Sequence, residues 1–203
     1  MKIICIGRNY AAHAKELKNE VPVAPVFFMK PDTALLKDNA PFYYPSFSND
    51  IHYEVELVAK ISKNGKTILP QFAHKYYEQI TVGIDFTARD LQQQCKEKGL
   101  PWEIAKSFDH SAVLGRFVNI ADLQNKTQIS FGLNLNNATV QQGDAAQMIF
   151  SIDQIIAYVS QFVTLKTGDL IYTGTPAGVG PVKIGDRLQA KIENEILLDF
   201  EIK

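Results

Sequence analysis

The chain has 203 residues, of which 46% are hydrophobic and 21% are charged, and its formal net charge is −1. The balanced charge disfavours a nucleic-acid partner, and no apolar run approaches the ~18 residues that a membrane span requires. We therefore expect a single globular domain over residues 1–203, with neither nucleic acid nor a membrane as its partner. The apolar stretch at the N-terminus is too short for a signal peptide. Cys5 and Cys95 are isolated from each other, which argues against a disulfide scaffold or a zinc site, so a cytoplasmic location is expected.

The first elements expected are a short buried strand over residues 2–6 and a helix over residues 11–18. His13 and Glu16 lie three positions apart on that helix, so they face the same side. Spacing alone fits an ordinary solvated helix surface as well as a functional pair. A second short strand is expected over residues 26–29, before Lys30-Pro31-Asp32 ends it.

The stretch 51–61, IHYEVELVAKI, predicts a strand with two carboxylates on one face. Side chains alternate with period two along a strand, so Glu54 and Glu56 stand side by side, with aliphatic residues around them. Like charges this close repel, and burying them without a partner is costly. A divalent cation would resolve the conflict, whereas an edge strand with a wet polar face would avoid it. The strand alone leaves both interpretations open.

Further along, Asn64-Gly65 is typical of a tight hairpin turn, residues 70–79 predict a helix, and residues 80–86 predict an apolar strand that contains Asp85. A helix over residues 87–98 follows, with Gly99 as its stop. Lys106 follows an apolar pair, where the usual arrangement is a lysine whose ammonium group reaches out to water.

Three carboxylates in apolar strand contexts, Glu54, Glu56 and Asp85, suit a hard cation such as Mg²⁺, Mn²⁺ or Ca²⁺ better than zinc or copper. The Gly/Pro-rich loop at residues 174–181 offers backbone N–H groups and hydroxyls that could hold a carboxylate, although it also fits a plain turn. It lacks the Gly-Lys-Ser/Thr of a phosphate-binding loop.

Strands dominate the second half of the chain. They are expected over residues 111–117, 129–135, 138–142, 170–173, 187–193 and 196–202, with one helix over Ile152–Phe162 capped by Ser151. Strands outnumber helices and come in uneven runs, which disfavours a regular doubly wound sheet. The fold class expected is α+β, with a mixed, mostly β domain and a few peripheral helices.

Six motifs occur in order along nearly the whole chain. They are IGRNY-x2-H-x2-E at 6–16, FMKP at 28–31, HYEVEL at 52–57, DFTARD-x-Q at 85–92, KGLPW-x3-KSFD at 98–109 and TGTP-x-GVGP at 173–181. Together they resemble the fumarylacetoacetate hydrolase family, and most closely its single-domain acylpyruvase and oxaloacetate decarboxylase branch.

The resemblance implies a mixed β-roll, a short N-terminal lid helix and a homodimer. It implies that Glu54, Glu56 and Asp85 hold Mg²⁺ or Mn²⁺, and that His13, Glu16 and Lys106 are catalytic, with the His13–Glu16 pair on the lid. It also implies substrate contacts for a second set of residues, with Lys30 near the mouth of the pocket: Arg8, Lys30, Arg89, Gln92 and Thr175.

The function that the resemblance implies is metal-dependent hydrolysis of a C–C bond in acylpyruvates, which are 2,4-dioxo acids such as acetylpyruvate or fumarylpyruvate. The products are pyruvate and a carboxylic acid, and decarboxylation of oxaloacetate is a second reaction for the same site. Two alternatives stay open. One is an isomerase or decarboxylase of the 2-hydroxyhepta-2,4-diene-1,7-dioate type. The other is a catalytically silent protein that binds a carboxylate through its metal.

Overall fold

The computed structural model describes residues 1–16, 20–126 and 128–203. Within these residues the largest sheet has eight strands: β1 (Ile3–Gly7), β2 (Val26–Lys30), β3 (Leu35–Leu36), β5 (Val55–Ile61), β6 (Tyr77–Asp85), β8 (Ala112–Leu114), β9 (Val118–Asn119) and β12 (Leu170–Tyr172). Their order is β2-β1-β12-β5-β6-β8-β3, and β9 pairs with β6 beside this path.

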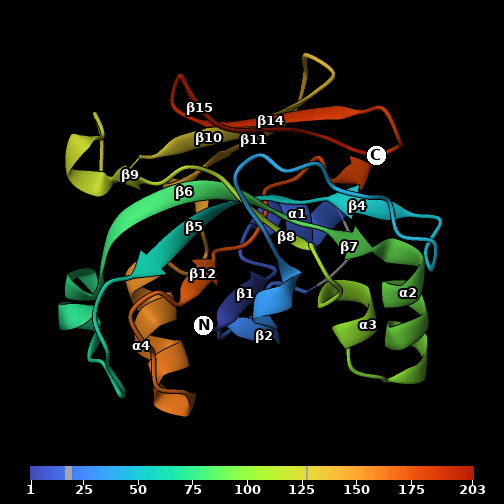
Figure 1. The fold of residues 1–203 in the computed structure, drawn as a ribbon. Helices are drawn as coiled ribbons and strands as arrows, with labels where there is room; N and C mark the ends of the chain where they lie inside the picture. The colour runs from blue at the N-terminus through green and yellow to red at the C-terminus, as the bar shows by residue number, and fades with distance from the viewer. Residues whose placement is uncertain (17–19, 127) are drawn as a thin grey trace.

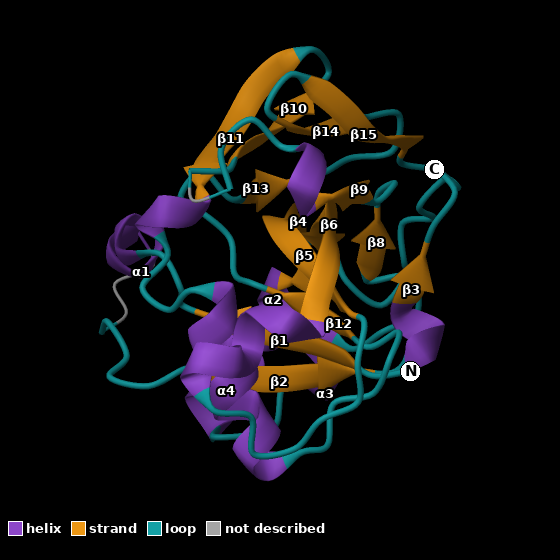
Figure 2. Cartoon of the chain, turned by 90° about the vertical axis from the view of Figure 1, so that its left-hand side faces the viewer, coloured by secondary structure: helices purple, strands orange, loops and turns teal. Residues whose placement is uncertain are grey.

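A second sheet is formed by β10 (Ser130–Leu135), β11 (Ala138–Asp144), β14 (Arg187–Ile192) and β15 (Glu195–Glu201) in the order β11-β10-β14-β15. A small third sheet joins β4 (Ile51–Tyr53), β7 (Thr87–Ala88) and β13 (Gly180–Pro181). Figure 1 shows the second sheet lying across the curved large sheet, and Figure 2 shows β1 and β2 at the side of the large sheet that is farthest from it.

The α-helices are peripheral and short: α1 (Ala11–Glu16), α2 (Arg89–Lys98), α3 (Glu103–Lys106) and α4 (Ile152–Phe162). Single 3-10 turns or short 3-10 helices occur at η1 (Asp32–Ala34), η2 (Pro70–Tyr76), η3 (Ile120–Asp122) and η4 (Ala145–Gln147). Ser151 caps α4 in a capping box with Gln154. Among the described residues, no helix is both long and apolar enough to cross a membrane.

One continuous hydrophobic core joins the two larger sheets. Leu57 and Ile84 of the large sheet belong to the same buried cluster as Leu133, Ala190 and Leu198 of the second sheet. Each of these strands alternates apolar residues toward this core with residues on its other face. The predicted α+β fold, a mixed β-roll with few helices, is confirmed.

The pairing around β12 brings two segments that are far apart in the sequence, β1 and β12, beside β5. β1 runs parallel to β12, with Ile3 opposite Leu170, and β12 runs antiparallel to β5. Thr173, directly after β12, donates its backbone N–H and its hydroxyl to the carbonyl of Leu57 on β5. The Gly/Pro-rich loop therefore begins beside Glu56.

Three local predictions differ from the structure. Residues 51–61 form two strands, β4 and β5, that separate at Glu54, whose carbonyl accepts from the Asp85 N–H. β5 and β6 are antiparallel, but Asn64-Gly65 does not join them as a tight hairpin, because Gly65 pairs with Leu165 and η2 lies in the connection. The helix expected over residues 70–79 is the 3-10 helix η2, followed by β6 from Tyr77. The last two residues of the helix expected over 11–18 lie outside the described residues.

Candidate active site

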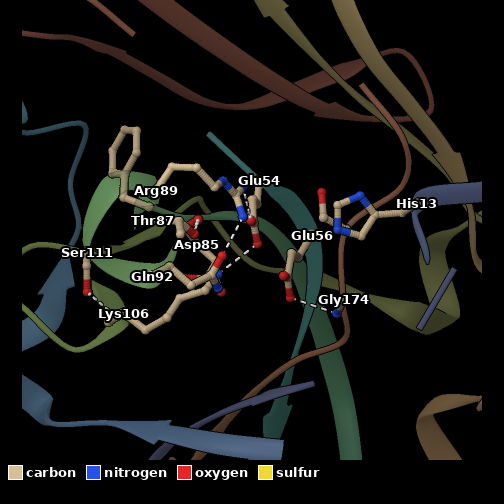
Figure 3. A network of polar contacts seen from close by, with 12 residues as sticks. His13, Glu54, Glu56, Asp85, Thr87, Arg89, Gln92, Lys106, Ser111 and Gly174 are labelled. Carbon is tan, nitrogen blue, oxygen red and sulfur yellow. Dashed lines mark hydrogen bonds and ion pairs between the residues drawn. The ribbon is translucent and has the colours of Figure 1, made fainter. Parts of the chain in front are cut away.

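Three buried carboxylates meet at the gap between β4 and β5. Glu54 lies in the gap itself, Glu56 is the second residue of β5, and Asp85 ends the neighbouring strand β6. One carboxylate oxygen from each lies within 4.8 Å of the others. Figure 3 shows the three side chains gathered between Lys106 and His13. The strand break allows Glu54 and Asp85 to converge, because the Asp85 N–H donates to the Glu54 carbonyl at 2.9 Å.

Two cationic side chains neutralise Glu54. The Lys106 ammonium donates to Glu54 Oε2 and to Asp85 Oδ2, each at 2.8 Å, and Arg89 donates to Glu54 Oε1 at 2.6 Å. Burial works to raise the pKa of Glu54, but the charges of Lys106 and Arg89 outweigh it and hold this pKa well below its usual range. Burial works to lower the pKa of Lys106, and the carboxylates of Asp85 and Glu54 outweigh it and raise this pKa.

Glu56 differs from Glu54, because no cation in the described ranges forms a salt bridge with it. Within the described residues its hydrogen bond comes from the backbone N–H of Gly174, at 2.7 Å. Burial, followed by the charges of Asp85 and Glu54, raises the pKa of Glu56 well above its usual range. A buried cluster of three carboxylates, one of which has no paired cation, offers the oxygen ligands that a hard divalent cation such as Mg²⁺ or Mn²⁺ prefers. Glu54, Glu56 and Asp85 are therefore the residues that could hold the metal.

The expectation that Lys30 lies near the mouth of the pocket is wrong. Its side chain is fully buried behind Asp85, and its Nζ lies 2.7 Å from Asp85 Oδ1. The same ammonium donates to Ser111 Oγ at 2.9 Å and to the carbonyls of Ser111 and Lys106. The physical reason is the burial of Asp85, which requires a counter-charge on its inner side.

The carboxylates line a cavity of about 40 Å³. It is small because Lys106 and Arg89 fold into the acidic cluster. The predicted site residues that also line it are Arg8, His13, Arg89, Gln92, Lys106 and Thr175. A wider cleft of about 600 Å³ lies elsewhere, between β9 and the β14–β15 turn. The charged pair there, Arg116 and Glu195, is largely exposed, so we place the chemistry in the smaller cavity.

His13 reaches this cavity from α1, and Glu16 lies behind it. His13 Nδ1 is 3.1 Å from Glu16 Oε2, and the Gly178 N–H donates to Glu16 Oε1 at 3.1 Å. An ionised carboxylate can only accept hydrogen bonds, so the contact with Glu16 selects the imidazole tautomer that has its proton on Nδ1 and its lone pair on Nε2. Figure 3 shows the His13 ring directed toward the glutamates. This arrangement can orient a general base.

The sequence patterns did not predict several residues of the site. Lys96 lines the cavity on the same helix face as Arg89 and Gln92, and this i, i+3, i+7 spacing could have revealed it. Its Nζ lies 5.7 Å from the centre of the Trp102 ring. Burial, together with the charges of Arg89 and Arg8, lowers the pKa of Lys96.

Asn9 and Gln141 were also missed. The buried Asn9 side chain donates to the carbonyls of Phe150 and Thr173 and accepts from the Phe150 N–H, which ties the β1–α1 turn to the start of the Gly/Pro-rich loop. Gln141 comes from the second sheet and donates to Thr175 Oγ1 at 2.9 Å. A glutamine in an ordinary-looking strand carries no sequence pattern that marks such a contact.

Comparison with known proteins places this chain in one family. Residues 2–199 match the family model described as fumarylacetoacetate (FAA) hydrolase C-terminal, and the chain belongs to the fumarylacetoacetate hydrolase family. Among its relatives is the mouse (Mus musculus) protein named oxaloacetate tautomerase FAHD1, mitochondrial, which is 42% identical over 99% of this chain and 91% of its own length.

Two further similarities cover most of both chains. The Dictyostelium discoideum protein named oxaloacetate decarboxylase, mitochondrial, is 41% identical over 94% of this chain and 88% of its own. The crystal structure of fumarylpyruvate hydrolase from Pseudomonas aeruginosa, in complex with Mn²⁺ and pyruvate, has a TM-score of 0.93. That structure is 37% identical, and the match covers 100% of this chain and 89% of the other.

Proposed function

We propose that this protein is a Mg²⁺- or Mn²⁺-dependent hydrolase that cleaves acylpyruvates into pyruvate and a carboxylic acid. The observation that carries the proposal is that the Glu16-oriented His13 and the three buried carboxylates face one cavity. The structural similarity to a fumarylpyruvate hydrolase that binds Mn²⁺ and pyruvate supports both the metal and the class of product.

When bound by Glu54, Glu56 and Asp85, the metal would supply Lewis-acid stabilisation of negative charge on the 2-oxo acid. The protein's own groups divide the remaining work. The Thr175 hydroxyl and the Lys106 ammonium bind the substrate carboxylate, and Arg89 and Gln92 orient the rest of the molecule. Gln92 accepts from Arg89 at 2.8 Å, so the two side chains act as one unit.

His13 Nε2 takes a proton from water, and the resulting hydroxide attacks the distal carbonyl of the 2,4-dioxo acid. The C–C bond that joins this carbonyl carbon (C4) to C3, on the pyruvate side, then breaks. Its electron pair leaves with the pyruvate fragment as the enolate, and the acyl group leaves as the carboxylic acid. The proton held by His13 returns to the enolate carbon, which completes pyruvate. Closure of α1 over the substrate excludes bulk water during this step.

Decarboxylation of oxaloacetate is a second candidate, favoured by the charges that line the cavity. Arg8, Arg89, Lys96 and Lys106 outnumber the three lining carboxylates, and a divalent ion adds further positive charge. A dicarboxylate balances this charge better than a monocarboxylate does. This reaction releases CO₂ and needs no water, so it does not require His13. An isomerase of the 2-hydroxyhepta-2,4-diene-1,7-dioate type would likewise need no hydrolytic base, and a silent carboxylate-binding protein would need no base at all.

A steady-state screen separates these functions. Acetylpyruvate, fumarylpyruvate and oxaloacetate are each supplied to the protein with Mg²⁺ or Mn²⁺, and pyruvate is measured before and after exhaustive chelation. We expect pyruvate from at least one acylpyruvate, and its loss on chelation or in Glu54→Gln and Asp85→Asn. Turnover that survives chelation would overturn the metal assignment. Binding of oxalate without turnover of any of these acids would point to the silent binding protein.

A further inference from the structure

A buried glutamine of the second sheet connects the two halves of the candidate site. Gln141 is 1% exposed and lies opposite Leu133 in the β10–β11 pairing. The register shifts directly after this pair, which makes Val140 the extra residue of a β-bulge, a feature that redirects neighbouring side chains. A Cβ on Gly178 would lie 2.4 Å from the Val140 carbonyl, so a glycine there lets the Gly/Pro-rich loop close against the bulge.

Each polar atom of the Gln141 amide has a partner. Its Oε1 accepts from the Val55 N–H at 2.9 Å, and its Nε2 donates to Thr175 Oγ1 and to the Pro176 carbonyl, each at 2.9 Å. An N–H can only donate and a carbonyl can only accept, so these partners fix which end of the amide is oxygen and which is nitrogen.

This orientation determines what the Thr175 hydroxyl can do. Because Gln141 Nε2 is the donor, Thr175 Oγ1 is the acceptor of their hydrogen bond, and the hydroxyl keeps its own proton. Among the described residues, no second partner takes that proton. Thr175 lines the cavity, so its O–H is left to donate into it, which is the polarity that an anionic carboxylate requires.

The other end of the amide holds the backbone between two of the carboxylates. Val55 lies between Glu54 and Glu56, at the point where β4 and β5 separate. Its N–H donates to the side-chain oxygen Gln141 Oε1. One side chain thus spans the Glu54–Glu56 backbone and the Thr175–Pro176 loop.

We infer that Gln141 is a positioning residue that sets the spacing between the acidic cluster and Thr175 and turns the Thr175 hydroxyl into a donor for the substrate carboxylate. It does not line the cavity itself. The inference rests on the proposed contact between Thr175 and that carboxylate. If it holds, removing Gln141 and removing the Thr175 hydroxyl damage the same interaction.

A double-mutant cycle tests this dependence. Oxalate binding to the Mg²⁺-loaded protein is measured by calorimetry for wild type, Gln141→Met, Thr175→Val and the double variant, with a thermal melt of each as the check on folding. Gln141→Met preserves the length of the side chain but removes the amide. We expect each single variant to weaken binding by about 10–100-fold, the range typical of residues that orient a ligand-binding group. We expect the double variant to bind no more weakly than the weaker single variant.

Gln142→Met is the matched control, because Gln142 is the next residue on β11 and its side chain is exposed. Its oxalate affinity should equal that of wild type. If Gln141→Met does not fold, Gln141→Asn replaces it in the cycle, since an amide one methylene shorter cannot span Val55 and Thr175 together.

The outcomes separate this inference from the proposed reaction. Effects of Gln141 and Thr175 that multiply in the double variant would overturn the positioning role, as would a wild-type protein that binds no oxalate. A wild-type protein that binds oxalate and shows the coupling, but turns over none of the acids in the screen, would refute the proposed hydrolysis and support the role of Gln141.

Discussion

At the residue scale, Glu56 is buried beside Asp85 and Glu54. The described part of the chain gives it a hydrogen bond from a backbone N–H but no salt bridge, and the charge of Lys106 only partly offsets its burial. Its raised pKa means that the folded protein holds this proton more tightly than the unfolded chain does. The contribution of Glu56 to stability is therefore fully present below the unfolded pKa, which is near 4.5, and is lost as the pH rises through the folded pKa.

We expect Glu56→Gln to stabilise the metal-free protein, and to do so increasingly as the pH rises. The amide oxygen still accepts from Gly174, but the buried charge is gone. The same change should remove most of the increase in melting temperature that Mg²⁺ or Mn²⁺ causes in wild type. Thermal melts across pH, with chelator and with metal, check both effects. A difference between variant and wild type that does not depend on pH would contradict the charge explanation.

His13→Ala should separate the two proposed reactions. Loss of a positioned general base typically lowers a rate by about 10²–10⁴-fold, and only hydrolysis needs this base. We expect acylpyruvate hydrolysis to fall by that factor while oxaloacetate decarboxylation is largely kept. Steady-state rates on both substrates measure the split. Equal losses on the two substrates would remove His13 from the role of hydrolytic base.

Lys96→Met tests whether the cations that line the cavity select dicarboxylates. Its Nζ is held near Trp102 and close to Arg8 and Arg89, so we expect a higher KM for oxaloacetate and a nearly unchanged KM for acetylpyruvate. Lys98→Met on the same helix is the control, because Lys98 does not line the cavity. An equal change in KM for the two acids would argue against a second carboxylate contact at Lys96.

The residue types of the site followed from the sequence, whereas several of their positions did not. Carboxylates in apolar strands must have partners, and that requirement led to Glu54, Glu56 and Asp85. Lys30 binds Asp85 from behind the acidic cluster, and Lys106 binds it from within the cluster. These positions depend on how the strands pack around Asp85. The position of the Gln141 side chain depends on a β-bulge and on a contact between two sheets. Neither feature produces a periodic pattern in the sequence.

At the scale of elements, the loop after β12 matters because its backbone contacts the site. Gly174 has a φ of +99°, and a Cβ there would lie 2.7 Å from the Cβ of Asn9. The turn after β1 and the loop after β12 can therefore approach closely only with glycine at this position. The same approach directs the Gly174 N–H toward Glu56.

Gly174→Ala should weaken both stability and metal binding. The left-handed backbone costs about 1–2 kcal/mol for an alanine, and the contact with Asn9 adds a steric cost of about 1–3 kcal/mol. Gly185→Ala is the matched control, since its φ is +94° and a Cβ there meets nothing within 4 Å. Urea unfolding and metal titration of both variants measure the difference. Equal losses of stability would show that the contact with Asn9 contributes nothing.

Elements with strong periodicity or end signals were predictable, and elements defined by distant contacts were not. Helix α4 has a capping box and an apolar face, and α2 ends at Gly99 in the left-handed conformation, so both were expected from local residues. Asn64-Gly65 carries a hairpin pattern, yet Gly65 pairs with Leu165, a residue far along the chain. A long-range pairing of this kind overrides a local turn preference.

At the scale of the whole molecule, the homodimer implied by the family resemblance stays a prediction. Light scattering after size exclusion should give twice the chain mass of 22.7 kDa. The measurement is made with and without Mg²⁺, because a dimer that depends on the metal would link assembly to the acidic cluster. A mass of 22.7 kDa in both conditions would refute the dimer.

The parallel pairing of β1 with β12 has a consequence for synthesis on the ribosome. Ile3 emerges before its partner Leu170, which follows on the order of ten seconds later at typical elongation rates. During that interval one edge of β1 has no neighbour, and an unpaired apolar edge is prone to join other chains. Gly174, which completes the environment of Glu56, emerges later still. A chain truncated before β12 therefore lacks a complete site and exposes the unpaired edge of β1. We expect chaperones and proteases to recognise such a chain.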